Sequence, residues 1–595
     1  MTSIFRSLAL AVCLTSTLGW SNDVIVSHGI AMHGNMKYSQ SDTHFGYVNP
    51  TAPKGGSVTL AGYGTFDSFN DDIVKGDPAT NINLIYDTLM VQAMDEPFTV
   101  YGLVAEKVEY PEDRSWIIFH LNPKARFHDG TSITGDDVVF TFNTLIEHGR
   151  PFYKAYYADV IKVEALSPQK VKFTARDGKN RELPLVLGQL RVMPKHHWKD
   201  KDFSKSTLIP PLGSGPYKVA SFDPGKSIKY ERAKDYWAKD LFARKGMYNF
   251  DTIQVEYYRD DTVMLEAFKG GRYDYRPENS SKRWATEYQG ANFDNDKIKV
   301  EEITHSNPTG MQAFVMNTRK PLFQNPLVRE ALDYAFDFEW TNKQLFYGAY
   351  KRTNSFFSNS DLAAKGLPSE KELALLNPYI DDLPKAVFSK QYESPTTNGS
   401  GNNRKNIRKA IGLLKEAGWI HKGTQLVNEK TGEPFRFEIL LHSKDFERIV
   451  LPYIKNLKKL GIEASARLVD TTNYIRIIRD FDFDMIIGSL PQSNSPGNEQ
   501  RDYWFSKFAD HKGSRNIIGI KDPLIDKLIE AIVAAQTRDD LVAACSALDR
   551  VLLWNHYVIP QWHIDKHRIA YWNKFEHPKT PPDYGDVGFF TWWIK

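Results

Sequence analysis

The sequence is poor in cysteine and has no excess of charge of either sign. Of its 595 residues only Cys13 and Cys545 are cysteines, and Cys13 falls in an N-terminal segment that we expect to be removed. A mature chain with one thiol cannot form an intrachain disulfide, so its stability must come from apolar burial, and we expect Cys545 to lie in the core. The 76 Lys and Arg residues nearly balance the 73 Asp and Glu residues, which argues against nucleic acid as the main partner.

The sequence also lacks the motifs of common enzymes and metal sites. It contains no H-E-x-x-H, no G-x-S-x-G and no phosphate-binding loop. His196 and His197 are adjacent, so in regular structure their side chains point apart. His563 and His567 lie in a predicted strand, too far apart to share a metal. We therefore expect no enzymatic activity, no metal and no cofactor, and a secreted hydrolase stays open only as an alternative.

The N-terminus has the layout of a secretory signal peptide. Arg6 precedes the short apolar run Leu8–Leu18, and the small residues Gly19 and Ser21 follow it. Cleavage after Gly19 or Ser21 would leave a periplasmic protein. The valine before Cys13 stands where a lipoprotein signal needs a small residue, so we expect no lipid anchor. A chain of this length, with 41% hydrophobic and 13% aromatic residues, predicts two or three well-packed lobes.

Periodicity predicts alternating strands and helices along much of the chain. In Trp116–Leu145 a strand, Trp116–Leu121, is followed by two turns and by a helix that Thr134 can cap. Further strands are predicted over Ser57–Ala61, Gln312–Asn317, Phe435–Leu441, Ile462–Val469 and Phe483–Gly488. Further helices are predicted over Asn83–Leu89, Pro326–Phe336, Arg404–Ala417 and Leu451–Leu460. The order predicts an α/β protein.

Two irregular loops at strand ends are candidate binding segments. Gly64–Asn70 follows a predicted strand and carries polar and aromatic residues. Ser489–Gln500 also follows a predicted strand, and its prolines, glycine, serines and asparagines exclude regular structure. Ligands often bind at such strand ends. A plain surface loop for the first, and a linker for the second, remain the alternatives.

Six segments, taken in chain order, resemble the signature of the family 5 extracellular solute-binding proteins. They are FHDGTSITGDDVVFTF (Phe127–Phe142), PLGSGPY (Pro211–Tyr217, with Ser214 where threonine is usual), GGRYD (Gly270–Asp274), Phe314–Asp337, AIGLLKEAGW (Ala410–Trp419) and VIPQW (Val558–Trp562). Three further segments are similar to the YejA subgroup of oligopeptide-binding members: Gly62–Asn70, Pro491–Trp504 and Gly513–Pro523.

The resemblance implies an α/β fold: a two-lobed periplasmic binding protein with mixed sheets, a hinge between the lobes and an extra subdomain inserted in lobe I. Residues 22–72, 205–305 and 554–595 would form lobe I. Residues 73–204 would form the subdomain, and residues 306–553 lobe II. The hinge would lie near Thr304–Asn317 and Leu553–Trp562.

The resemblance also implies a function. The protein would be the substrate-binding component of an ABC importer, a monomer that captures oligopeptides, modified peptide antibiotics included, in the cleft between its lobes. It would deliver them to an inner-membrane permease and its ATPase subunits. Other members of the family bind different solutes, so an oligosaccharide, a metal chelate or a murein peptide remains an alternative ligand.

Within the family, an aspartate in a loop corresponding to Gly488–Gln500 meets the ammonium group of the peptide, and this chain has Gln492 there. The acid is therefore expected from Glu499, Asp502 or Asp67, unless no free amine is required. Arg501 and Arg515 are candidate ligands for a terminal carboxylate. The other candidate contacts are Thr65, Phe66, Phe69 and Asn494. For the aromatic residues among them, ordinary packing in the core is the alternative. We expect Thr65–Asn70 and Gln492–Arg501 to face each other across the cleft.

Overall fold

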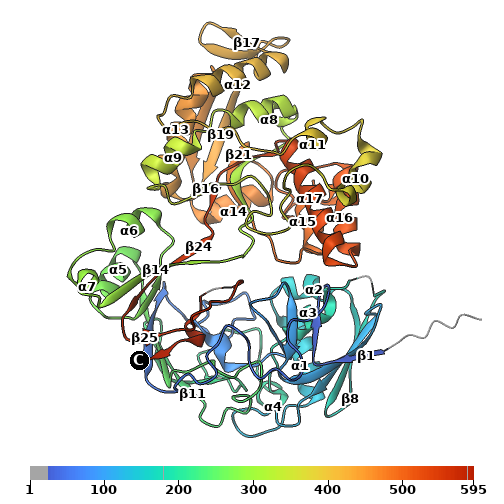
Figure 1. Ribbon diagram of the computed structural model, residues 1–595, viewed down its shortest axis with the longest axis vertical. Coiled ribbons are helices and arrows are strands. Elements are labelled where there is room, and N and C mark those ends of the chain that lie inside the picture. The colour runs from blue at the N-terminus through green and yellow to red at the C-terminus, as the bar shows by residue number, and fades with distance from the viewer. Residues whose placement is uncertain (1–23, 179, 586) are drawn as a thin grey trace, which may run out of the picture.

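The computed structural model describes residues 24–595 apart from 179 and 586, so the predicted signal peptide and Cys13 lie outside the described residues. Two bodies are stacked one above the other and joined at one side (Figure 1). We call residues 24–304 and 566–595 the lower lobe, and residues 311–560 the upper lobe. Of the helices in this described part, none is long and apolar enough to cross a membrane.

A five-stranded antiparallel sheet forms one end of the lower lobe. Its strand order is β1 (Val24–Ser27), β6 (Ala105–Pro111), β7 (Trp116–Leu121), β9 (Lys170–Ala175) and β8 (Val160–Ser167). The strand β7 has the predicted bounds, and α1 (Gly135–His148) follows it. The N–H of Thr134 donates to Oδ2 of Asp137 (2.9 Å), so this helix begins at the predicted cap.

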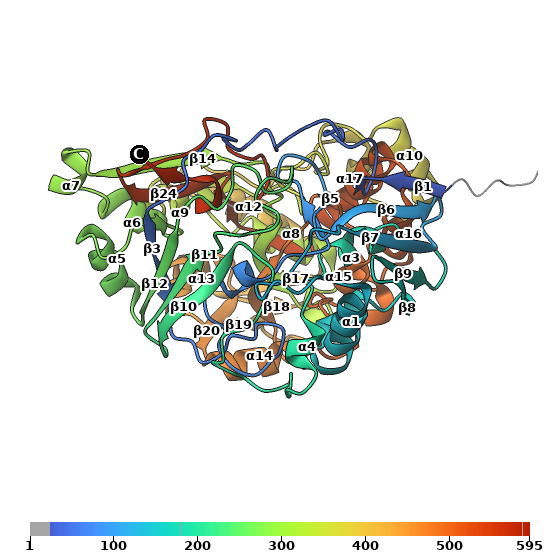
Figure 2. The same cartoon turned by 90° about the horizontal axis from the view of Figure 1, so that it is seen from below.

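A second sheet lies at the opposite end of the lower lobe (Figure 2). It contains β10 (Tyr217–Asp223), β11 (Ser227–Arg232), β12 (Thr252–Tyr258) and β3 (Ser57–Tyr63), with α5 (Asp261–Lys269) after β12. A third sheet contains β13 (Tyr275–Pro277), β24 (Lys566–Trp572) and β14 (Ile298–Thr304). One hydrophobic core joins all three sheets, because Phe119, Tyr230 and Ile569 belong to the same cluster of buried side chains. The predicted subdomain 73–204 therefore shares its core with lobe I, and its boundaries stay a prediction.

The upper lobe is built on one mixed sheet covered on both faces. Its strand order is β20 (Glu463–Leu468), β19 (Arg436–Leu441), β21 (Met485–Leu490), β15 (Met311–Met316) and β22 (Val558–Pro560). Ala313 and Val315 of β15 pack toward α16 (Pro523–Ala534) and α17 (Arg538–Trp554). Phe314 and Met316 pack toward the opposite face, which α8 (Pro326–Asp333), α12 (Arg404–Glu416) and α13 (Glu447–Lys458) cover. Such two-sided burial makes β15 and β21 a rigid support.

The chain crosses between the lobes twice. The first crossing runs from the end of β14 to the start of β15, and the second from β22 to β24. The strand β22 pairs with β15 of the upper sheet, so the predicted boundary between residues 553 and 554 is placed too early. The strand β1, predicted in lobe I, pairs instead with β6 of the predicted subdomain.

Two local predictions are wrong. The predicted helix Asn83–Leu89 is only a 3-10 turn, Ile82–Ile85, which begins after Asn81 in a left-handed conformation (φ 65°). The predicted irregular loop Ser489–Gln500 is shorter than expected, because β21 continues through Leu490 and α15 (Glu499–Trp504) begins at Glu499. As predicted, Cys545 is a buried free thiol on α17.

Candidate functional site

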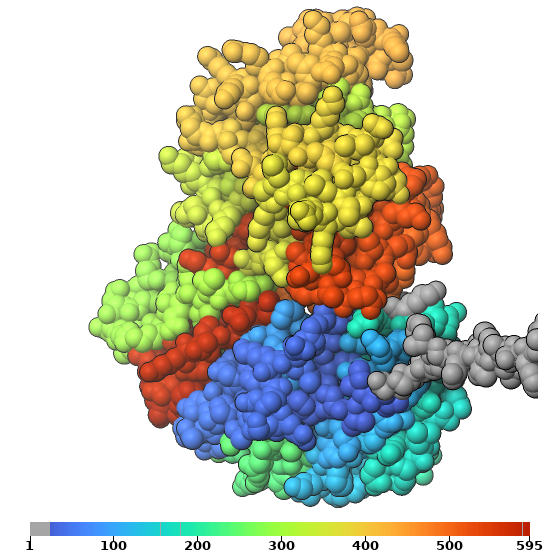
Figure 3. Space-filling view, turned by 45° about the vertical axis from the view of Figure 1, so that its right-hand side comes forward, coloured from blue at the N-terminus to red at the C-terminus, as the bar shows by residue number. Residues whose placement is uncertain are grey.

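A cavity of about 630 Å³ lies between the two lobes. Its lower wall comes from the lower lobe and its upper wall from Gln492–Ser495, while the first crossing and the C-terminal segment close its sides. Figure 3 shows the orange-red atoms of the upper lobe against the blue atoms of the lower lobe in this region. The lining residues are Gln92, Ala93, Met94, Phe98, Tyr156, Glu182, Gln189, Asn307, Pro308, Gln492, Ser493, Asn494, Ser495, Tyr584 and Gly585.

The lower wall is assembled from the ends of short elements. Gln92 ends β4 (Met90–Gln92), and Tyr156 ends α2 (Phe152–Tyr156). Glu182 immediately precedes α3 (Leu183–Gly188), whose side chains are buried along its whole length. Because the apolar helix is fixed in the core, it holds the carboxylate of Glu182 at the cavity.

The upper wall is a loop held from behind. Oε1 of Gln492 accepts a hydrogen bond from Nε2 of Gln500 (2.7 Å), whereas Nε2 of Gln492 is buried and has no partner among the described residues. Nη1 of Arg538 donates to the main-chain oxygen of Asn494 (2.5 Å), and Arg538 also forms an ion pair with Asp361 (2.6 Å). These contacts fix the loop and leave the side-chain N–H of Gln492 free to donate a hydrogen bond to an acceptor on a ligand.

Two carboxylates, one from each lobe, meet beside the cavity at Gly497. The N–H of Gly497 donates to Oε2 of Glu499 (2.9 Å). A Cβ atom on Gly497 would lie 2.8 Å from Oε2 of Glu182 and 3.5 Å from Oε2 of Glu499. Burial and then the charge of Glu499 raise the pKa of Glu182 to about 8. Burial also raises the pKa of Glu499, against the opposing hydrogen bonds from Gln500 and Gly497.

Further contacts join the two lobes beyond the cavity. On the side away from the crossings, Nε2 of His33 lies 3.1 Å from the carbonyl oxygen of Ala535, and Nη1 of Arg181 donates to Oε1 of Gln536 (2.9 Å). The two lobes thus touch each other beside the cavity, which lies between them.

The structure separates the predicted residues of the upper lobe. Gln492 and Asn494 line the cavity, and Glu499 lies directly behind it. Arg501 instead forms an ion pair with Glu530 of α16 (2.7 Å). Asp502 pairs with Arg515 (3.6 Å), whose guanidinium lies over the ring of Tyr503 (5.4 Å). Neither Arg501, nor Asp502, nor Arg515 is among the lining residues described for this cavity.

The aromatic residues predicted in the lower lobe are core residues. Phe66 and Phe69 are each 2% exposed and stack on one another, with ring centroids 6.0 Å apart. Thr65 and Asp67 are exposed, and Asp67 accepts a hydrogen bond from the N–H of Asp77 (2.6 Å) within the same lobe. The prediction that Phe66 and Phe69 line the cleft is therefore wrong, since apolar packing at the strand end buries both rings.

The segment opposite Gln492–Ser495 is also not the predicted Thr65–Asn70. At the described cavity the facing residues are Gln92–Met94, Tyr156 and Glu182. Sequence reasoning missed these residues because they belong to no motif and come together only through contacts distant in sequence. The one local signal is Glu182 itself, a carboxylate directly before the apolar run Leu-Pro-Leu-Val-Leu.

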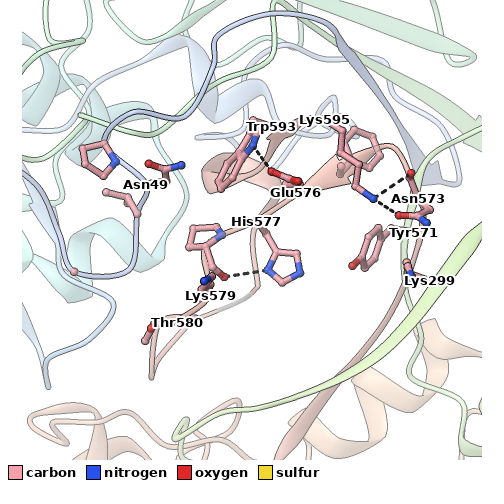
Figure 4. A pocket seen from close by; sticks show the side chains of 15 residues that line it. Asn49, Lys299, Tyr571, Asn573, Glu576, His577, Lys579, Thr580, Trp593 and Lys595 are labelled. Carbon is pink, nitrogen blue, oxygen red and sulfur yellow. Dashed lines mark hydrogen bonds between the residues drawn. The ribbon is translucent and has the colours of Figure 1, made fainter.

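A second cavity of about 630 Å³ lies within the lower lobe (Figure 4). Its walls include Asn49, Tyr571, His577 and Lys595, and Trp593 Nε1 donates to Oε2 of Glu576 (3.1 Å) beside it. Since one lobe supplies the whole wall, movement between the lobes cannot enclose a ligand there. Within the described residues, no group of His, Cys, Asp and Glu side chains is arranged to hold a metal ion.

The comparisons with known proteins identify the family. Residues 99–512 match the model of the bacterial extracellular solute-binding proteins, family 5. The probable peptide-binding protein YejA of Agrobacterium fabrum is 44% identical over 575 residues, covering 95% of this chain and 93% of its own. The peptidoglycan-binding protein YepA of the same organism is 40% identical over 584 residues, covering 95% and 94%.

A solved structure shows the same fold. The oligopeptide-binding protein AppA of Bacillus subtilis, in complex with a nonapeptide, superposes with a TM-score of 0.66 at 21% identity, covering 92% of this chain and all of its own. The family match, the YejA relative and the two-lobed fold confirm the resemblance that the motifs predicted. The chain belongs to the family 5 extracellular solute-binding proteins of bacteria.

Proposed function

We propose that this protein captures oligopeptides in the cavity between its lobes and presents them to an ABC permease. The observation that carries the proposal is a cavity whose walls come from both lobes and from the first crossing. Its volume, about 630 Å³, is in the range that small-ligand sites occupy. The names of the relative YejA and of the AppA complex support a peptide as the solute.

Binding would work through differential affinity for the closed form. A ligand that contacts both Gln492–Ser495 and the lower wall stabilises closure, whereas a ligand that contacts one wall does not. A shift from mostly open to mostly closed requires roughly 5 kcal/mol of preference. Main-chain hydrogen bonds to an extended peptide can supply it without selecting side chains.

We assign Gln492 and Asn494 to the peptide main chain, and Glu499 to a positively charged group of the ligand. Arg501, Asp502 and Arg515 pair with one another or with Glu530, so each would have to leave a partner to reach a ligand. We therefore do not propose that either arginine binds the carboxylate group of the ligand.

The setting of the protein follows from the same proposal. It would act in the periplasm as a monomer, with a permease and its ATPase subunits in the inner membrane as partners. It would bind its solute without turning it over, so a peptide incubated with the pure protein should be recovered intact.

Native mass spectrometry of the purified protein tests the solute, and calorimetry tests the residues. Gln492→Ala and Asn494→Ala should each weaken peptide binding, whereas Asn402→Ala, on an exposed loop of the same lobe, should not. Recovery of a non-peptide solute, together with no measurable peptide binding, would refute the proposal.

A murein peptide is the second candidate, favoured by the relative named as a peptidoglycan-binding protein. Competition between a murein tripeptide and a linear peptide of ordinary amino acids distinguishes the two. Tighter binding of the murein peptide would transfer the assignment to it.

A further inference from the structure

The two glutamates at Gly497 belong to different lobes. Glu182 lies before α3 of the lower lobe, and Glu499 begins α15 of the upper lobe. Oε2 of each lies within 3.5 Å of the position that a Cβ atom on Gly497 would take. The carboxylates are therefore neighbours only while the lobes are together, and opening of the cleft separates them.

The surroundings supply little positive charge to this pair. Throughout the described ranges, the carboxylate of Glu182 accepts no hydrogen bond and enters no ion pair, and the carboxylate of Glu499 is held by the N–H of Gly497 (2.9 Å) and by Nε2 of Gln500 (3.2 Å). The positive charge of Arg515 acts to lower the pKa of Glu499. The Arg515 side chain is, however, 61% exposed and pairs with Asp502. Two ionised carboxylates in such a place repel each other strongly.

The other titratable groups that face the pair are neutral at ordinary pH. They are Tyr156 of α2, Tyr503 of α15 and Cys545 of α17, and burial raises the pKa of each. Nε2 of Gln492, a buried donor without a partner in the described chain, lies on the same cavity as Glu182. The pair therefore borders a cavity that has room for a ligand group and a free donor to hold it.

We propose that the closed cleft holds one positive charge between Glu182 and Glu499, supplied by a proton in the empty protein and by a cationic group of the ligand in the loaded protein. When the ligand's ammonium group enters, the carboxyl group becomes a carboxylate and its proton leaves to solvent. The ligand class is thus a solute with an amine at the end that reaches this pair. The ligand half of this inference rests on the proposed function, whereas the proton half does not.

The sign of the pH dependence follows from the raised pKa of Glu182. Opening should expose Glu182 and return its pKa toward the ordinary value of 4.5, whereas in the closed form its pKa is about 8. Closure therefore takes up one proton between these values. His33, which contacts Ala535 of the upper lobe and whose pKa is lowered to about 4, opposes this effect below pH 6.5. The closing equilibrium of the empty protein should therefore fall, by up to tenfold per pH unit, as the pH rises from about 6.5 to 8.

Small-angle scattering of the empty protein from pH 5 to pH 9 tests the proton half. The radius of gyration should increase toward pH 9. Glu182→Gln or Glu499→Gln should reduce the increase, and the double variant should remove it, because burial raises the pKa of each glutamate even without the other. Glu147→Gln and Glu429→Gln, at exposed positions of the lower and upper lobes, should behave like the parent. A radius that does not change with pH in the parent, or an increase of full size in the double variant, would overturn the proton half.

Calorimetry at pH 6.5, where the empty protein should be closed and its pair protonated, tests the ligand half in phosphate and in Bis-Tris, with a peptide and its N-acetylated form as probes. The free peptide should release close to one proton per molecule bound, and the release should disappear in Glu182→Gln. Acetylation should weaken binding at least tenfold in the parent. Tight binding of the peptide without proton release would overturn the inference alone, whereas no binding of either probe, with the scattering result intact, would count against peptide as the solute.

Discussion

A single methyl group at Gly497 should weaken ligand binding without weakening the fold. The glycine lies in the upper lobe, and the closest atom that its Cβ would meet is Oε2 of Glu182 in the lower lobe, at 2.8 Å. Its backbone is not in the left-handed region, so alanine introduces no strain within its own lobe. The clash therefore exists only in the closed form.

The magnitude follows from the nature of the contact. Inserting a methyl group into a packed site typically destabilises it by about 1–3 kcal/mol. Because the atom met here is the end of a flexible side chain, we expect the lower value. A loss of about 1 kcal/mol of closure corresponds to a roughly fivefold weaker apparent affinity for a ligand that needs both lobes.

Titration calorimetry and thermal unfolding on Gly497→Ala check both halves of this prediction, with two other glycines as controls. Gly412, on α12, has no atom within 4 Å of the position that a Cβ would take, so it should accept alanine with a small gain in stability and unchanged affinity. Gly488→Ala would meet Cγ2 of Val315 at 2.8 Å within the upper sheet and should lower the melting temperature instead. If Gly497→Ala lowers the melting temperature as Gly488→Ala does, or leaves affinity unchanged, the reasoning about closure is refuted.

Three further predictions concern the buried groups. Arg550→Met should destabilise the protein by about 3–5 kcal/mol in urea unfolding, because it leaves the carboxylate of Glu372, 2.6 Å from Arg550 Nε, buried without its partner; Arg550→Met with Glu372→Leu should recover part of the loss. Burial raises the pKa of Cys545 well above its ordinary value, so a thiol reagent should label it only at the rate of local or global unfolding, measured by mass spectrometry; rapid labelling at neutral pH would contradict its burial. Burial and nearby arginines lower the pKa of His33 to about 4, so its neutral form is favoured and stability should fall as the pH drops from 6.5 toward 4, with His33→Asn giving a flatter profile in chemical denaturation.

Sequence reasoning succeeded where a segment's own pattern decides its structure. The strand Trp116–Leu121 and the cap at Thr134 depend on alternation and on a side chain three residues away, so the structure has both where they were predicted. The helix predicted at Asn83–Leu89 failed because its backbone is set by packing against other segments, with Asn81 in a left-handed conformation. The prediction for Phe66 and Phe69 was wrong for a similar reason. The sequence pattern of an aromatic residue after a strand does not distinguish a core position from a cleft position.

The binding segment of the upper lobe was easier to predict than its counterpart in the lower lobe, because the two walls are built from different kinds of element. Gln492 follows β21, a central strand that the apolar run Met485–Ile487 predicts, whereas Gln92, Tyr156 and Glu182 lie at the ends of short elements that no period reveals.

The first crossing links that strand end to the hinge. Gly310, in a left-handed conformation (φ 64°), lies so close to β21 that a Cβ atom would overlap the carbonyl oxygen of Leu490. Only glycine combines that backbone angle with that proximity. The crossing chain therefore packs directly against the start of the loop that carries Gln492. We therefore expect a rotation about the crossing to carry the binding loop with it, so that a ligand held by this loop would affect the angle between the lobes.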